Sequence, residues 1–196
     1  MTKADWRERM KTLPRATAEE SRAIQSRLLA QDWWAAAWTV GLYRAIGSEP
    51  ATEMLLADLA ARSACAAVPV WQPDRRAYGW GRTTASTRWR QGKFRIEEPD
   101  PVVLVPPEFL RVLVLPGVAF DFTGGRLGRG GGFFDRLIVQ SPAFMIGLCT
   151  ERCLVESLPM EPHDVRMDAV MTEKRIRFTP GAAVKLEQMI NGRYVC

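Results

Sequence analysis

A glycine-rich segment in the middle of the chain restricts the fold more than any other feature. Six of the nine residues from Gly124 to Gly132 are glycine, whereas the whole chain of 196 residues contains 15 glycines. Each glycine costs about 1 kcal/mol relative to alanine in a helix, so this segment forms neither a helix nor a good strand. A backbone without Cβ atoms can approach a ligand closely and point successive N–H groups at it. The segment predicts a ligand-binding loop or, as the simpler alternative, a flexible connection.

The residues on both sides of the glycines favour a phosphate site. The apolar run 112–115 is typical of a buried strand, and the apolar residues of 133–138 have helical spacing. A strand, a glycine loop and a helix N-terminus in this order form an arrangement that binds phosphate. Arg126 and Arg129 add donors that match phosphate oxygens.

Asp135 is a carboxylate close to this expected phosphate site, and the two anions would repel each other. A divalent cation between them would resolve the repulsion, since Mg²⁺ is commonly held by one or two carboxylates and by nucleotide phosphates. The loop is not a Walker A motif, because no Gly-Lys-Ser/Thr follows the glycines. It also departs from the dinucleotide-binding fingerprint, because charged and bulky residues occupy the tight turn.

Composition indicates an ordinary globular protein. With 47% hydrophobic and 25% charged residues, 196 residues suffice for one domain with its own core, and we expect a single domain over residues 1–196. No apolar run approaches the roughly 18 residues of a membrane span, and the first residues lack the apolar stretch of a signal peptide. We therefore expect a cytoplasmic protein without a membrane partner, either a monomer or a weak dimer.

Charge and cysteine content are less informative. The net charge is +5 and 22 of the 27 basic residues are arginine, which fits an anionic partner such as a nucleotide, a polyglutamate tail or nucleic acid, and equally fits a GC-rich genome. The four cysteines contain no CxxC pair, and the chain has one histidine, so inert thiols are a better interpretation than a zinc site. They are Cys65, Cys149, Cys153 and Cys196.

Alternating helix and strand patterns predict an α/β fold with a central, mainly parallel sheet and helices on both faces. Helical patterns cover about 3–12, 17–31, 52–62 and 180–190, and strand patterns cover 38–43, 66–71, 112–115 and 144–148. Residues 82–100 are polar and predict a small β excursion or a loop. We expect the aromatic cluster of Trp33, Trp34 and Trp38 to lie in the core rather than to stack on RNA.

The segment PGVAFDFTGGRLGRGGGFFD, residues 116–135, resembles the signature of 5-formyltetrahydrofolate cyclo-ligases. The resemblance extends over about residues 3–175 and is weak over 72–95. It implies a three-layer α/β/α fold with an N-terminal helical segment, and an ATP- and Mg²⁺-dependent reaction. In that reaction ATP phosphorylates the formyl oxygen of 5-formyltetrahydrofolate, N10 attacks the activated carbon, and 5,10-methenyltetrahydrofolate, ADP and phosphate are released.

The resemblance also implies roles for individual residues. Arg126 and Arg129 would be catalytic, and Asp135 and Asp164 would hold the metal. The folate would contact Glu49, Arg7, Arg129, Gly130, Gly132 and Phe133. The ATP-binding set would be Lys3, Arg7, Arg126, Leu127, Gly128, Arg129, Gly130, Gly131, Gly132, Phe133 and Phe134.

Four positions depart from the family pattern. Phe133 and Phe134 replace paired tyrosines, which removes two hydroxyl groups, and Gly131 stands where some members have a lysine. In the segment FRIEEP, residues 94–99, Arg95 replaces the usual glycine. The resemblance leaves open a paralogue that acts on another formyl or carboxyl substrate, or that only binds folate. An RNA-binding protein is the alternative from another class, and the acidic neighbours of the loop make nucleic acid a poor partner.

Overall fold

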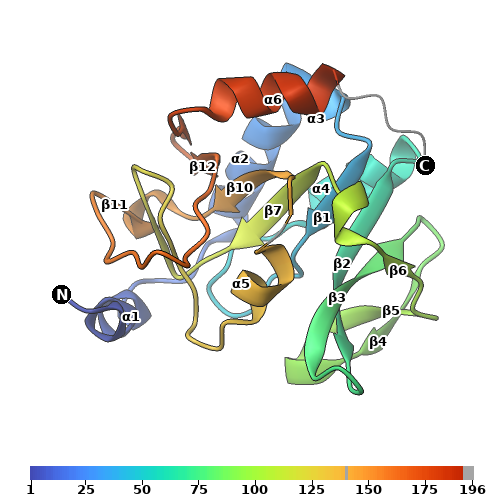
Figure 1. The fold of residues 1–196 in the computed structure, drawn as a ribbon, viewed down its shortest axis with the longest axis horizontal. Coiled ribbons are helices and arrows are strands. Elements are labelled where there is room, and N and C mark those ends of the chain that lie inside the picture. Colours follow the sequence, from blue (N-terminus) through green and yellow to red (C-terminus); the bar gives the residue numbers. More distant parts are fainter. Residues whose placement is uncertain (140, 192–196) are drawn as a thin grey trace.

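A computed structural model describes residues 1–139 and 141–191, and its centre is an eight-stranded sheet (Figure 1). The strand order is β13-β12-β10-β7-β1-β2-β3-β6, and the five strands from β12 to β2 are parallel to one another. At the two edges, β13 pairs antiparallel with β12, β3 pairs antiparallel with β2, and β6 pairs antiparallel with β3. The bounds are β1 Thr39–Leu42, β2 Cys65–Gln72, β3 Ala77–Thr83, β6 Leu104–Val105, β7 Val112–Pro116, β10 Phe144–Leu148, β12 Ala169–Met171 and β13 Ile176–Phe178.

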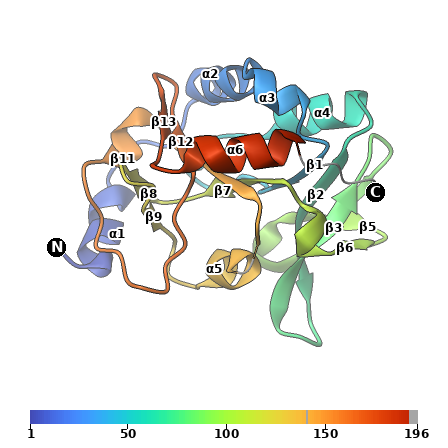
Figure 2. The ribbon, with the colours of Figure 1, turned by 45° about the horizontal axis from the view of Figure 1, so that its top comes forward.

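Helices cover both faces of this sheet, but unequally (Figure 2). One face carries α2 (Ala18–Leu29), α3 (Asp32–Ala35), α4 (Glu53–Ala61) and α6 (Ala182–Asn191), and the other carries the short α5 (Phe133–Ile138). The predicted three-layer α/β/α arrangement with a mainly parallel sheet is therefore confirmed.

Two smaller sheets flank the central one. Beside α1 (Lys3–Lys11), a three-stranded sheet joins β11 (Leu154–Val155), β8 (Ala119–Asp121) and β9 (Arg126–Leu127). Near the β3 edge, β4 (Arg88–Gln91) and β5 (Glu97–Asp100) form a two-stranded ribbon, which is the excursion predicted within 82–100. Three single 3₁₀ turns complete the elements: 93–95, 107–109 and 151–153.

Local sequence explains where the first two helices begin. Thr17 accepts a hydrogen bond from the backbone N–H of Glu20 at 3.1 Å, and its own N–H donates to the Glu20 carboxylate at 2.8 Å. Thr2 and Asp5 form the same reciprocal pair at the start of α1. Each capping box satisfies donors that a helix N-terminus leaves free, so the predicted start of the second helix is confirmed.

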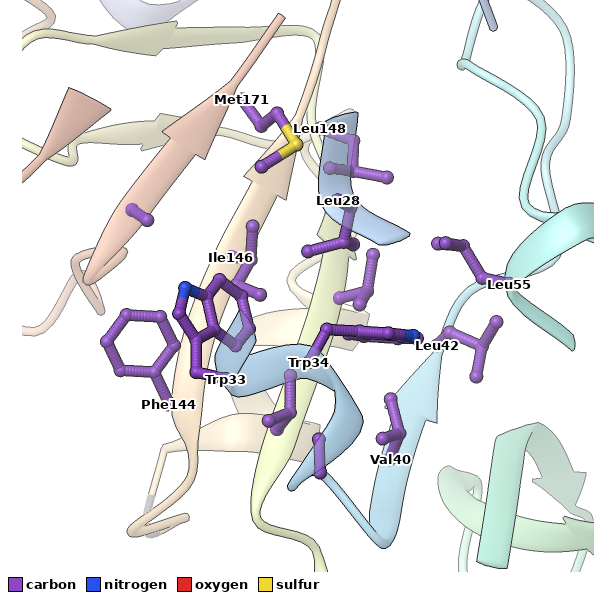
Figure 3. Close-up of a cluster of buried hydrophobic side chains, with 14 of the residues drawn as sticks. Leu28, Trp33, Trp34, Val40, Leu42, Leu55, Phe144, Ile146, Leu148 and Met171 are labelled. Carbon is purple, nitrogen blue, oxygen red and sulfur yellow. The ribbon is translucent and has the colours of Figure 1, made fainter. Parts of the chain in front are cut away.

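The larger part of the core lies between the sheet and the four-helix face. Figure 3 shows the indoles of Trp33 and Trp34 packed among aliphatic side chains from the sheet and α4. Both indoles are buried, as expected, whereas the expectation for Trp38 was wrong, because its side chain is 58% exposed. Trp38 immediately precedes β1, where the guanidinium of Arg62 lies 5.6 Å from its ring at the surface.

In the part of the chain that the structure describes, no helix is long and apolar enough to cross a membrane. Cys149 is buried, and Cys65 and Cys153 are partly buried. Burial raises the pKa values of Cys149 and Cys153 above the ordinary thiol range, which favours the unreactive protonated form. Cys196 and the predicted helix end at Gly192 lie outside the described residues.

Candidate active site

A cavity of about 400 Å³ lies where residues that follow β1 and β7 meet the glycine-rich segment. Ligands of open α/β sheets bind outside the carboxyl ends of the parallel strands, and this volume is in the range of small-molecule sites. The lining residues come from six parts of the chain: Arg44, Ile46, Glu49, Pro69, Tyr78, Phe94, Ile96, Pro116, Gly117, Arg126, Gly128, Arg129, Gly131, Gly132, Phe133, Phe134, Asp135 and Leu137.

Aromatic rings form one part of the wall. Phe133 lies edge-to-face against Tyr78 and Trp71, with ring centroids 5.5 and 6.1 Å apart, and Phe94 lies 5.6 Å away. Such contacts fix ring orientation and leave an apolar surface suited to a flat ligand. Tyr78 lines the cavity, whereas Trp80, two residues later on β3, belongs to the buried core.

Arg126 supplies a buried positive charge to the opposite part of the wall. Its side chain is only 2% exposed, its Nη2 donates to Asp135, and its Nε has no hydrogen-bond partner among the described residues. Burial lowers the pKa of Arg126, while Asp135 and Asp164 oppose that shift. A guanidinium keeps its charge under such a shift, so the cavity contains a fixed cation with an unused donor.

Arg129 joins the glycine segment to the turn after β1. Its Nε donates to Glu49 Oε1 at 3.1 Å and its Nη2 to the Ile46 carbonyl at 3.0 Å. Glu49 Oε2 accepts the N–H of Ile46 at 2.9 Å, so each carboxylate oxygen accepts one hydrogen bond and has a lone pair left for a ligand. Burial raises the pKa of Glu49, although these donors act in the opposite direction. Arg129 and Glu49 therefore form one unit in the cavity wall.

Gly47 makes this unit possible. Its φ of +66° is strained for any other residue, and a Cβ added there would lie 3.3 Å from Nη2 of Arg129. The guanidinium thus crosses directly over this glycine to reach the Ile46 carbonyl. The glycine between strand and helix is a positioning residue that the sequence alone did not single out.

The glycine-rich segment is more structured than a simple loop. Asp121 Oδ1 accepts hydrogen bonds from the N–H groups of Thr123 and Gly125, both at 2.8 Å, and closes the turn between β8 and β9. Leu127 on β9 packs into the core beneath α1, so its side chain does not face the cavity. Only its backbone remains available for the ATP-binding role that the resemblance implied.

The helix after the glycines is short. α5 has six residues, and its N-cap Gly132 is in the left-handed conformation without a side-chain cap hydrogen bond. So short a helix has a weak macrodipole, so the loop N–H groups and the arginines are the stronger donors for an anion on this side of the cavity.

Lys3, Arg7 and Asp164 lie behind the loop and do not line the cavity. Arg7 Nε donates to the Gly128 carbonyl at 2.8 Å and its guanidinium carbon lies 3.4 Å from the place of a Cβ on Gly130. Lys3 Nζ lies 2.6 Å from Asp164 and 2.7 Å from Glu161. α1 therefore supports the loop from its outer side and brings Lys3 and Arg7 to the same end of the site.

The carboxylates at this end fit a hard divalent cation. Asp135 pairs with Arg126, and Asp135 and Asp164 both counteract the lowering of the Arg126 pKa by burial. Ligand atoms of Glu161, His163 and Asp164 lie within 4.8 Å of one another, and this group does not include Asp135. Oxygen-rich donor sets of this kind suit Mg²⁺, with nucleotide phosphates and water completing the shell.

Known proteins share both the sequence and this architecture. The family model of the 5-formyltetrahydrofolate cyclo-ligase family matches residues 4–173. The chain belongs to the 5-formyltetrahydrofolate cyclo-ligase family. A cyclo-ligase from Mycolicibacterium smegmatis is 36% identical over 146 residues, covering 70% of this chain and 74% of the relative. The Haemophilus influenzae cyclo-ligase is 36% identical over 132 residues, covering 64% and 71%.

A solved structure of a cyclo-ligase relative agrees with the fold described above. The 5,10-methenyltetrahydrofolate synthetase of Aquifex aeolicus has 25% identity and a TM-score of 0.81, and the match covers all of this chain and 97% of that one. The eight-stranded sheet and its helical layers are therefore the cyclo-ligase fold.

The candidate site contains residues that the sequence did not indicate. Arg44 lines the cavity and pairs with Glu97 and Glu53, which ties the β4–β5 ribbon to the main sheet. Phe94 and Ile96 reach the cavity from that ribbon. The polar sequence of the ribbon gave no indication that it contributes to the cavity. The segment 94–99, which resembles the family, was the one signal that could have indicated this role.

The departure at Arg95 from the family's glycine has a visible structural consequence. Phe94 and Arg95 both have positive φ, +56° and +60°, in the turn that joins β4 to β5. A side chain in this region costs of order 1 kcal/mol or more relative to glycine. The backbone of this turn therefore has the left-handed conformation that favours glycine, although arginine occupies position 95.

Proposed function

We propose that this protein catalyses the ATP-dependent cyclisation of 5-formyltetrahydrofolate to 5,10-methenyltetrahydrofolate. The observation that carries the proposal is the single cavity wall that combines an aromatic surface with the buried Arg126, its partner Asp135 and the glycine backbone. A flat pterin fits the aromatic surface, and a triphosphate fits the part formed by Arg126, Asp135 and the glycine backbone. Membership of a family of ATP-dependent ligases supports the same reaction.

In this reaction the protein mainly positions ATP and the folate and neutralises the phosphate charge. The formyl oxygen attacks the γ-phosphorus and ADP leaves, which makes the formyl carbon electrophilic. N10 then bonds to that carbon and loses its proton, and the C–O bond breaks as phosphate departs. The formyl oxygen is thus released in phosphate.

Individual residues have distinct roles in the proposed reaction. Arg126 stabilises negative charge on the transferred phosphoryl group, and N–H groups of Gly128 and of 130–132 hold the other phosphates. Lys3 and Arg7 bind phosphates from the α1 side. Mg²⁺, held by Asp135 and Asp164, would neutralise phosphate charge.

The folate would meet the remaining part of the wall. Glu49, held by Arg129, orients the pterin through its amino and ring N–H groups, and Phe133 packs against the ring. The loss of the family's two tyrosine hydroxyls leaves this packing intact. A cytoplasmic location remains our prediction, since one relative, from Arabidopsis thaliana, is named as mitochondrial.

An isotope experiment tests the proposed bond changes. Purified protein is given 5-formyltetrahydrofolate labelled with ¹⁸O in the formyl group, together with MgATP. The expected result is one ¹⁸O atom in each phosphate released, measured by mass spectrometry. Unlabelled phosphate from a reaction that forms the methenyl product would contradict activation of the formyl oxygen by phosphorylation.

A further inference from the structure

Lys93 has an unusual environment for an ammonium group. It is partly buried in the turn between β4 and β5, and its Nζ lies 3.2 Å from the centroid of the Trp71 ring. The rings of Phe94 and Phe133 are 5.3 and 5.7 Å away. Ring faces attract a cation and hold it in place without neutralising it. Lys93 is therefore positioned while its charge stays available.

No carboxylate among residues 1–139 and 141–191 pairs with Lys93. The nearby carboxylates are engaged elsewhere: Glu97 pairs with Arg44, and Glu98 pairs with Arg90 and accepts the N–H of Trp71. A partly desolvated cation without an anionic partner is costly unless a ligand supplies one.

The place of Lys93 relative to the cavity indicates which part of a ligand it meets. Lys93 and Trp71 do not line the cavity themselves, but the rings of Phe94 and Phe133 do, and Phe94 is exposed, so this turn lies beside the mouth. Arg126 is the buried charge of the cavity wall, with only 2% of its side chain exposed. A ligand whose reactive group meets Arg126 extends its other end past Lys93.

We propose that Lys93 binds a carboxylate at the solvent end of the substrate and makes the site selective for the glutamyl form of the folate. The proposal rests on the proposed function, because the pteridine must occupy the aromatic part of the cavity with its aminobenzoyl-glutamate directed outward. The chemical class recognised is an aromatic amide that carries a carboxylate tail.

Steady-state kinetics with two substrates test this role. One is 5-formyltetrahydrofolate, and the other is its pteroate analogue, which lacks the glutamyl group. For the wild-type protein we expect a KM about two- to fivefold lower for the glutamyl substrate, the range for one partly exposed charge pair. Lys93→Gln should abolish this preference with little change in kcat, and Lys93→Arg should restore most of it.

Arg88→Gln is the matched control. Arg88 is an exposed cation on β4 of the same ribbon, outside the turn that holds Lys93, and its loss changes net charge by the same amount. This variant should keep the wild-type preference. If Lys93→Gln raises KM equally for both substrates, the lysine merely supports Trp71 and the turn, and the proposal is overturned.

Direct binding separates failure of this proposal from failure of the proposed function. The two compounds are titrated against the wild-type and Lys93→Gln proteins, with tryptophan fluorescence as the readout. Tighter binding of the glutamyl compound by the wild-type protein alone supports the role of Lys93, even without turnover. Equal binding of both compounds by both proteins overturns it, and turnover with equal binding leaves the proposed function intact.

Discussion

Arg126 is the residue on which the proposed chemistry depends most. A guanidinium held in a buried position by Asp135 needs little reorganisation when charge develops on a transferred phosphoryl group. The sequence indicated both residues, but their pairing could not be inferred, since nine positions separate them and the first lies on a strand and the second on a helix.

Arg126→Ala and Asp135→Ala should each lower kcat by two or more orders of magnitude, because each removes a preorganised charge beside the phosphates. The measurement is steady-state turnover of 5-formyltetrahydrofolate, with circular dichroism to show that each variant is folded. Arg22→Ala, an exposed position on α2, serves as the control. Normal turnover by a folded variant would remove that residue from the site.

Substitution of Gly47 tests the role of the Arg129–Glu49 ion pair. Gly47→Ala places a methyl group against the Arg129 guanidinium and strains a backbone with φ of +66°. We expect a loss of about 1 kcal/mol in the free energy of unfolding and a several-fold rise in KM for the folate. Urea denaturation and kinetics measure the two effects. An unchanged KM would show that Glu49 does not need Arg129 to meet the substrate.

At the scale of elements, α2 is fastened to the loop after β10 by one ion pair. Arg152 Nη2 donates to Glu20 Oε2 at 2.9 Å, and the same guanidinium nitrogen donates to the Arg15 carbonyl at 2.8 Å. The hydrogen bond from Arg152, aided by the N–H of Thr17, lowers the pKa of Glu20 to about 2. Glu20 is thus both a helix cap and an anchor between elements.

This lowered pKa predicts a pH-dependent stability. A carboxylate whose pKa falls on folding stabilises the protein at pH values above the pKa of the unfolded state, here 4.5. This stabilisation is lost as the pH falls towards 2. Glu20→Gln should therefore unfold more easily than the wild-type protein at pH 7, by about 1 kcal/mol. The difference should shrink between pH 4.5 and 2. A difference that stays constant over this range in urea titrations would contradict the assignment.

Hydrophobic periodicity predicted the long elements well and the short ones poorly. The strand predicted over 144–148 coincides with β10, and the helix over 52–62 with α4, because both have a continuous apolar face. Two-residue strands such as β9 and β11 have no period to detect, and tertiary pairing alone creates them. The same reason explains why the inward direction of Leu127 was not foreseen.

At the scale of the whole molecule, the site depends on elements that are distant in sequence. The glycine segment, the turn after β1 and the β4–β5 ribbon meet because β1 and β7 are neighbours in the sheet. Sequence reasoning located the phosphate side, since its residues are consecutive. It could not place Tyr78, Phe94 and Arg44 in one wall, because chain crossovers bring them there.

The most direct test of the central claim is a single absorbance assay. Purified protein is mixed with 5-formyltetrahydrofolate, ATP and Mg²⁺, and the near-ultraviolet absorbance of 5,10-methenyltetrahydrofolate is followed, with controls that omit ATP or Mg²⁺. We predict that product forms only when both are present. Absence of product from folded protein that still binds ATP would contradict the assigned substrate and favour a paralogue that acts on a different formyl compound.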